Sequence, residues 1–189
     1  MVATLEHDPV QKLRAQARDS GWPVIFDPEL NFDRPALGNF IKLWQAKRGN
    51  RPMPARSDFS ARDLKANLSR VILFETAPGT RYRVRLMGSA LTQVWGDLTG
   101  RFVDEAVPPH LLPRWIGFLE GVLALRRPLR LKAQVAFMEK TYLVAEFAAV
   151  PLCDDAGHPT MVMCVVHASS DHPWSRVGEA LLADTVNFV

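Results

Sequence analysis

The sequence lacks the short motifs that identify the common catalytic and nucleotide-binding sites. It contains no H-E-x-x-H, no G-x-S-x-G, no P-loop, and no carboxylate pair that periodicity places on one face. Asp154 and Asp155 lie beside Gly157 and His158, a common turn composition and an incomplete set of metal ligands. We therefore predict that the protein is not an enzyme and has no metal site.

Cysteine and long hydrophobic runs are also scarce. Cys153 and Cys164 are the 2 cysteines, and their spacing is far from C-x-x-C, so we expect reduced, structural thiols. The apolar runs 143–152 and 161–166 are too short to cross a membrane. Residues 1–10 carry acids and no apolar core, unlike a secretion signal. We expect a cytoplasmic protein without a membrane anchor.

The charge balance gives little support for a polyanionic partner. The formal net charge is +3, and the bases are interleaved with acids throughout the chain. We therefore predict no nucleic-acid partner. The 189 residues are 48% hydrophobic, which suffices for one domain with a substantial core and extensions.

Periodicity predicts strands and helices in a mixed order. Period-two or compact apolar patterns predict five strands, at 71–76, 82–86, 129–138, 141–152 and 160–168. Period-3.6 patterns and caps predict helices at 10–18, 35–48, from Ser60, from Ser89, from Pro108 to Arg126 and at 176–184. Hairpins at both ends of this order favour an α+β domain, with one antiparallel sheet covered on one face by helices.

The stretch 82–101 contains three glycines that admit two interpretations. Gly88 ends the second strand, Gly96 ends the short helix after Ser89, and Gly100 closes a turn. They could form a phosphate cradle, but their spacing does not match G-x-G-x-x-G. Turns with positive φ explain them without a ligand, and we favour that structural role.

Several residues in linear order resemble the PAS domain family, in particular a bacterial PAS-like family found as small stand-alone proteins in alphaproteobacteria. The matching residues are Trp44 with Arg48-Gly49, Pro54-x-Arg56-x-Asp58, Leu64 and Leu68, Tyr82-Arg83-x-Arg85-Leu86-x-Gly88-x-x-Leu91, and Gly96-x-Leu98-Thr99-Gly100. The resemblance covers roughly residues 37–168. It implies a five-stranded antiparallel sheet with helices over one face, and a role in sensing or protein association.

The resemblance also predicts how the chain is divided. We expect an N-terminal helical extension at 1–34, a PAS-like domain at 35–170 that includes its N-terminal helix, and a tail with a short helix at 171–189. No output domain follows in the sequence, so we expect any signal to pass through a signalling protein partner.

Some PAS domains hold haem, flavin or a metabolite between sheet and helices, and this implies a candidate pocket. Its predicted residues are Trp95, Phe102, Trp115, Phe137, Met163 and His167. Aromatic residues at such spacing are more often core than cofactor site, so a filled core is favoured over a pocket. The cofactor stays unknown, with none favoured and haem or a small metabolite as alternatives.

Histidine and cysteine positions bear on those cofactors. His110 or His167 could serve as an axial haem ligand, but neither is placed distinctively. A reactive flavin-site cysteine should lie in the helical middle, whereas both cysteines lie at the late strands. A light-sensing flavin domain is therefore disfavoured.

Charged residues of the matching motifs also have two interpretations. Arg56 and Asp58 could anchor a ligand or partner, but we favour their pairing to fix the proline-rich linker against the domain. Arg81, Arg83 and Arg85 could meet an anionic nucleotide or an acidic partner. A solvated strand face with neighbouring acids is the favoured interpretation.

The sequence leaves two main functional hypotheses, ahead of a third, an enzyme of unrecognised type, for which it places no polar cavity rich in acids and bases. The first is a PAS-like sensory or signalling module that acts through protein–protein interaction and responds to a small ligand. It would form a homodimer through the apolar stripe of Leu37, Phe40, Ile41 and Trp44, which would otherwise stay exposed. The alternative is a small-molecule or haem binding protein whose pocket lies between sheet and helices.

Overall fold

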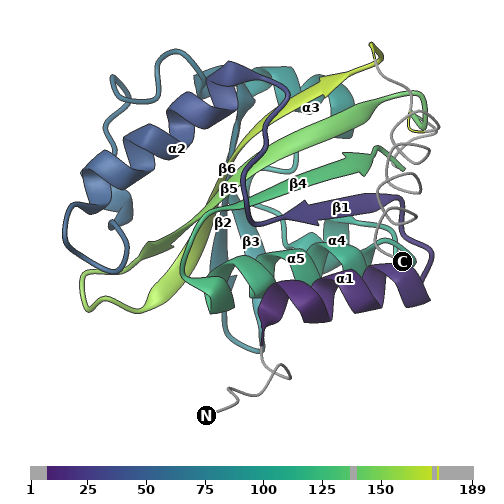
Figure 1. The fold of residues 1–189 in the computed structure, drawn as a ribbon, viewed down its shortest axis with the longest axis horizontal. Coiled ribbons are helices and arrows are strands. Elements are labelled where there is room, and N and C mark those ends of the chain that lie inside the picture. The colour runs from purple at the N-terminus through teal and green to yellow at the C-terminus, as the bar shows by residue number, and fades with distance from the viewer. Residues whose placement is uncertain (1–7, 137–139, 172–173, 175–189) are drawn as a thin grey trace, which may run out of the picture.

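A single antiparallel sheet organises the molecule (Figure 1). The computed structural model describes residues 8–136, 140–171 and 174. Within them the sheet has 6 strands in the order β1-β4-β5-β6-β2-β3. The strands are β1 (Val24–Asp27), β2 (Val71–Ala77), β3 (Arg81–Met87), β4 (Leu129–Gln134), β5 (Val144–Cys153) and β6 (Pro159–Ser169). The five predicted strands are confirmed as β2 to β6, and the α+β class is confirmed.

Strand β1 is an addition to the predicted five strands. It comes from the N-terminal extension and pairs with β4, with Val24 opposite Ala133 and Asp27 opposite Arg130. The sequence patterns assigned no strand to this segment. The pairing covers the edge of β4 that a five-stranded sheet would leave open.

The helices cover both faces of the sheet, not one face as predicted. They are α1 (Pro9–Asp19), α2 (Pro35–Arg48), α3 (Ser89–Trp95), α4 (Val103–Ala106) and α5 (Leu112–Leu125), with short 3₁₀ turns η2 (Arg56–Asp58) and η3 (Leu68–Arg70). Helices α1, α3, α4 and α5 share one apolar core with the sheet, whereas α2 belongs to a second core on the opposite face (Figure 1). The helix at 176–184 lies outside the described residues.

Strand β5 shows why two layers of helix are needed. All ten of its residues are buried. Phe147 and Ala149 belong to the core under α5, while Ala148 and Val150 belong to the core under α2. A strand that is apolar on both faces must be covered on both, as the apolar run 143–152, interrupted by Glu146, indicates.

The apolar stripe of α2 packs against the chain's own sheet, so the predicted dimer interface is wrong. Leu37, Phe40, Ile41 and Trp44 are only 0%, 1%, 5% and 1% exposed. The Trp44 indole Nε1 donates a hydrogen bond of 2.9 Å to the Pro151 carbonyl of β5. A second copy could reach these side chains only if α2 left the sheet.

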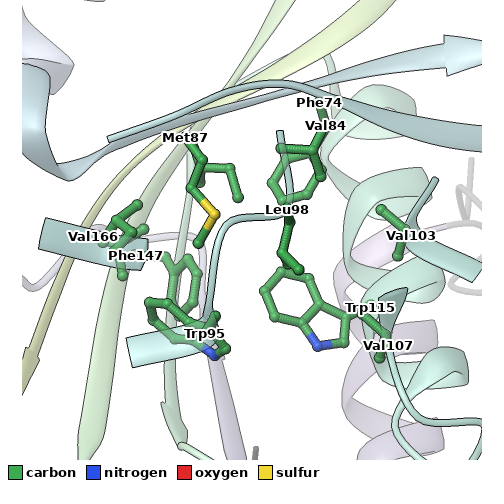
Figure 2. Close-up of a pocket in the computed structure, with 12 residues that line it drawn as sticks. Phe74, Val84, Met87, Trp95, Leu98, Val103, Val107, Trp115, Phe147 and Val166 are labelled. Atoms are coloured by element: carbon green, nitrogen blue, oxygen red, sulfur yellow. The ribbon is translucent and has the colours of Figure 1, made fainter. Parts of the chain in front are cut away.

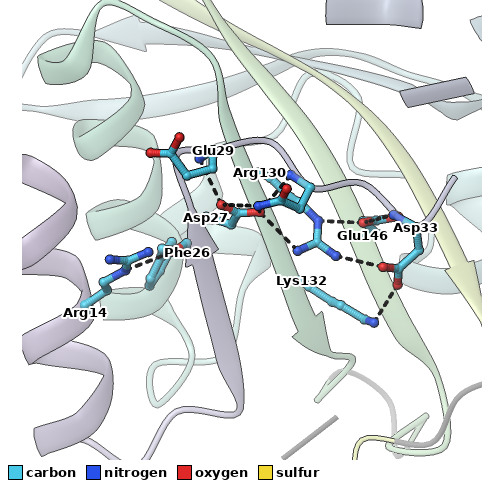
Figure 3. Close-up of polar contacts among 9 residues, drawn as sticks. Arg14, Phe26, Asp27, Glu29, Asp33, Arg130, Lys132 and Glu146 are labelled. Atoms are coloured by element: carbon cyan, nitrogen blue, oxygen red, sulfur yellow. Dashed lines mark hydrogen bonds and ion pairs between the residues drawn. The ribbon is translucent and has the colours of Figure 1, made fainter. Parts of the chain in front are cut away.

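The N-terminal extension is fastened to the sheet by a buried ionic network (Figure 3). Arg130 Nε lies 2.6 Å from Glu146 Oε1, and its two terminal nitrogens lie 3.4 Å from Asp27 and 3.1 Å from Asp33. Lys132 Nζ lies 2.6 Å from the other oxygen of Asp33. The network joins β1 and the loop after it to β4 and β5.

The linker after α2 is fixed locally and not by the predicted pair. Asp58 accepts hydrogen bonds from the Ala55 amide at 2.7 Å and from Arg51 at 2.8 Å. Arg56 instead donates to the Phe59 carbonyl at 2.8 Å. The Arg56–Asp58 pairing is therefore wrong, although both residues stabilise the linker, as expected.

The predicted helix after Ser60 is a series of turns. The reciprocal bonds of a capping box are present, from the Ser60 amide to Asp63 at 2.8 Å and from the Asp63 amide to Ser60 Oγ at 3.2 Å. The Ser60 hydroxyl, Lys47 and the Ser60 amide all donate to the Asp63 carboxylate, and these bonds lower the pKa of Asp63 to about 2. The amides of Lys65 and Asn67 then bond three residues back, so no α-helix propagates.

Two of the three glycines behave as predicted. Gly96 and Gly100 have φ of 74° and 84°, which glycine adopts without strain. Gly88 is different, because its φ is −69°. A Cβ at Gly88 would lie 2.3 Å from the backbone carbon of Ser69, so this glycine is required by close backbone approach.

The cysteines are buried, as expected for structural thiols. Cys153 and Cys164 are buried and free, and burial raises the pKa of the Cys164 thiol. No helix in the described part of the chain is long and apolar enough to cross a membrane. Those same residues bring together no group of three His, Cys, Asp or Glu side chains that could hold a metal ion.

Candidate functional site

The candidate site is a small apolar space between the sheet and helices α3, α4 and α5, here called the chamber (Figure 2). It encloses about 20 Å³, enough for one water-sized molecule. The described residues that line it are Ile72, Phe74, Val84, Met87, Leu91, Trp95, Leu98, Val103, Val107, Trp115, Phe147 and Val166. None of these side chains is an acid or a base, so the lining supplies no acid–base chemistry.

Four aromatic contacts build the chamber wall. Trp115 stands at 6.0 Å from Phe74 and 6.1 Å from Phe147, measured between ring centroids. Phe147 also lies 6.1 Å from Trp95 and 6.0 Å from Phe118. Phe147 is thus the centre of the cluster, and Figure 2 shows it beside Trp95. Tilted and edge-on pairs at these separations are favourable aromatic geometries.

A second cavity of about 20 Å³ lies on the other side of this aromatic wall. Trp95, Trp115 and Phe147 line both cavities. The second cavity is further lined by Arg114, Phe118, Leu131, Ala133, Gln134, Val135 and Ala145. It therefore combines apolar walls with one buried cation.

Helix α5 contacts the aromatic wall with one face and α1 with its other face. Trp115 and Phe118 point to the sheet, and the apolar residues of α5 give it a broad buried face. On its other side, Gly121 lets α1 approach, because a Cβ there would lie 2.4 Å from the Leu13 side chain. The same helix therefore contacts the chamber and the N-terminal extension.

The predicted pocket residues divide into three groups. Trp95 and Trp115 do line the chamber. Phe102 does not line it; its ring lies under the guanidinium groups of Arg81 and Arg83, at 3.8 Å and 4.8 Å. Phe137 lies outside the described residues. The cation–π contacts fix the loop 100–102 along the edge of β3, where Arg83 bridges Phe102.

Met163 and His167 lie on the other face of β6, so their assignment to the pocket is wrong. Met163 is buried in the α2 core. His167 lines a separate polar depression with Arg34 and Glu146. Because side chains alternate along a strand, Val166 takes the chamber side in their place.

Haem does not fit the chamber as the structure has it. No histidine is among its described lining residues, and a space of about 20 Å³ is far smaller than a macrocycle. His110 is exposed in the loop before α5, as expected. Burial and the charges of Arg70 and Arg34 lower the pKa of His167, whose Nε2 is buried without a hydrogen-bond partner among the described residues.

Sequence reasoning missed Phe74, Phe147 and Arg114. Strand parity groups Phe147 with Ala145 and Ala149, but it does not say which face the helices of the chamber cover. Arg114 lies next to Trp115 in an apolar helix, and this isolated charge was a visible signal.

The strand arginines behave as a solvated face. Arg81 forms ion pairs with Asp104 at 2.8 Å and Glu105 at 2.6 Å, and Arg85 lies 3.3 Å from Glu75. The favoured interpretation is confirmed for these two arginines. Arg85 is exposed and Arg81 is half-buried; both are neutralised by neighbouring acids and lie away from the chamber lining.

The comparisons with known proteins identify the domain. The family model described as "PAS domain" matches residues 32–166. This match confirms the resemblance that the sequence motifs indicated. No curated protein matches the chain.

One solved structure is similar over much of its length, the "Sensory Box Histidine Kinase/Response Regulator from Burkholderia thailandensis E264". It is 15% identical, with a TM-score of 0.40, over 68% of this chain and 97% of the other.

Proposed function

Because the chain belongs to the PAS domain family, we propose that it is a sensory module whose chamber responds to a small molecule and whose state is passed to a partner protein. Sensing in a PAS module requires that a buried site and an outer surface share a structural element. The free, buried cysteines support a location in the reducing cytoplasm, which is part of the proposal.

The observation that carries this proposal is the position of α5. Trp115 and Phe118 meet the aromatic wall of the chamber, while Gly121 meets Leu13 of α1. Packed helices respond to a volume change by shifting together, because cores have little free volume. A change inside the chamber would therefore move α1, and through it the outer surface that a partner contacts.

The test compares the same substitution, valine to isoleucine, at two adjacent residues of β6. Val166→Ile adds a methyl group inside the chamber, whereas Val165→Ile adds one on the opposite face, in the α2 core. Because the added methyl group fills the chamber and tightens the packing of α5 against the sheet, hydrogen exchange measured by mass spectrometry should slow in α5 and in α1 for Val166→Ile. The Val165→Ile variant should alter exchange in α2 instead.

Equal exchange in α1 for the wild type and Val166→Ile would contradict transmission through α5. The partner itself, including a second copy of the chain, is tested by light scattering after size exclusion. A monomer mass at every concentration would exclude a second copy of the chain as the partner and would leave only proteins of a different sequence.

A second function, a plain small-molecule binding protein, is favoured by the buried cation of the second cavity. Visible absorbance and native mass spectrometry of freshly purified protein would reveal a retained ligand. A ligand whose release leaves exchange in α1 unchanged would favour this alternative over the sensory module.

A further inference from the structure

Arg114 is a buried charge without a partner. It is only 9% exposed. Within residues 8–136 and 140–171 its guanidinium forms no hydrogen bond and no ion pair. Burial alone lowers the pKa of Arg114, and no neighbouring acid offsets that effect. Such a group is costly to a fold, since a cation with so little exposure loses much of its hydration and gains no counter-charge in return.

The position of Arg114 in its helix adds to that cost. It is the third residue of α5, in the first turn. The N-terminus of a helix carries a partial positive charge, which disfavours a cation and attracts an anion. An apolar side chain at this position would satisfy the packing without either penalty.

The surroundings of Arg114 are those of a binding pocket for an amphipathic anion. Trp95, Trp115 and Phe147 separate its cavity from the chamber and are shared by both. Leu131 and Ala133 of β4 give it an apolar floor. Apolar walls with a few placed polar groups are typical of small-molecule sites, and arginine binds a carboxylate with two parallel hydrogen bonds.

We propose that Arg114 recognises the carboxylate of a small aromatic or aliphatic monocarboxylic acid, whose apolar body enters the chamber between Trp95, Trp115 and Phe147. The acid is expected to have one carboxylate because Arg114 is the one cation among the described residues that line the cavity. The two cavities are small, so the aromatic wall must turn aside and join them when the acid binds. The inference rests on the proposed function, because it names the ligand class of the same site.

The experiment measures the affinity of the whole chain for two acids and their neutral analogues. The probes are phenylacetate and hexanoate, compared with phenylacetamide and hexanamide, by calorimetry and by the fluorescence of the tryptophans. The wild type should bind each acid at least about tenfold more tightly than its amide, since a hydrogen-bonded ion pair is worth more than a neutral contact.

Two variants assign that preference to Arg114. Arg114→Met should abolish the preference for the acid while still binding the amide, and Arg114→Lys should retain part of it. Arg127→Met removes an exposed arginine just beyond the same helix and should leave both affinities unchanged. Circular dichroism confirms that each variant is folded.

Native mass spectrometry of protein taken directly from cells completes the test. Equal binding of acid and amide, or an acid preference that survives in Arg114→Met, would overturn the inference and leave the sensory function standing. A retained neutral ligand would do the same. Failure of every probe to bind, with no retained mass, would overturn both.

Discussion

At the scale of single residues, Gly88 shows a requirement that its backbone angles do not reveal. Its φ and ψ of −69° and 148° suit any residue. The constraint is the backbone of Ser69 and Leu68, which lies within 2.5 Å of the place where a Cβ would stand. Neither backbone segment can yield as a flexible side chain would.

Replacement of Gly88 by alanine is therefore expected to destabilise the protein by about 1–3 kcal/mol or more, the range typical of overpacking. Gly38 in α2 is the matched control, because no atom lies within 4 Å of its Cβ position. Gly38→Ala should stabilise by about 0.5–1 kcal/mol through helix propensity. Urea denaturation measures both; equal effects of the two changes would contradict the assignment.

His167 gives a second prediction at this scale. Desolvation, aided by Arg70 and Arg34, lowers its pKa below 6.5. The unfolded chain then takes up a proton near pH 6.5 while the folded chain does not, so stability is lost as the pH falls through that value. His167→Gln should reduce the loss of unfolding free energy between pH 7 and pH 5, measured in urea. An unchanged pH dependence would show that other groups cause it.

At the scale of elements, β6 separates two cores by strand parity. Val166 faces the chamber and Val165 faces α2. Val166→Ile should stabilise by about 0.8 kcal/mol, because the added methyl group occupies existing space. Val165→Ile should destabilise by about 1–3 kcal/mol, since Val165 is fully buried within the α2 core, where an added methyl group overpacks its neighbours. Thermal unfolding distinguishes them, and destabilisation of similar size in both would argue against a chamber.

The elements themselves were largely predictable, whereas the faces they cover were not. The pattern of α2 identified Leu37, Phe40, Ile41 and Trp44 as one apolar stripe, but local periodicity does not say what covers it. The largely apolar run of β5 implied covering on both faces, and combining the two observations would have placed α2 against the sheet. For the same reason Met163 and His167 were grouped correctly with each other and assigned to the wrong face.

The candidate site was predictable only where it depends on a single helix. Trp95 and Trp115 were recognised because helical spacing turns both toward the sheet. Phe147 and Arg114 required knowledge of which strands lie under which helices. That arrangement follows from the crossover between β3 and β4, a long-range choice that short patterns do not encode.

At the scale of the whole molecule, Arg130 connects the N-terminal extension to the sheet. Its side chain and that of Glu146 are only 8% and 6% exposed. Arg130→Met should destabilise by about 3–5 kcal/mol, because it leaves buried carboxylates without their cation. The double variant Arg130→Met with Glu146→Leu should recover part of that loss.

The control for the network is the exposed pair of Arg34 and Asp171, whose side chains are 42% and 64% exposed. Arg34→Met should change the unfolding free energy by no more than about 1 kcal/mol. Chemical denaturation followed by circular dichroism measures the series. A loss at Arg130 as small as that at Arg34 would show that the extension is not held by this network.

Strand β1 has a consequence for any shortened form of the chain. The family match begins at residue 32, beyond β1, and the sequence alone suggested a boundary at residue 34. A chain cut there would lose α1, β1 and the Asp27 partner of Arg130, and it would leave the outer edge of β4 without a neighbour. Open strand edges pair with other molecules, so the trimmed protein should aggregate. The four residues of β1 therefore protect the full chain from fibril growth by occupying the edge of β4.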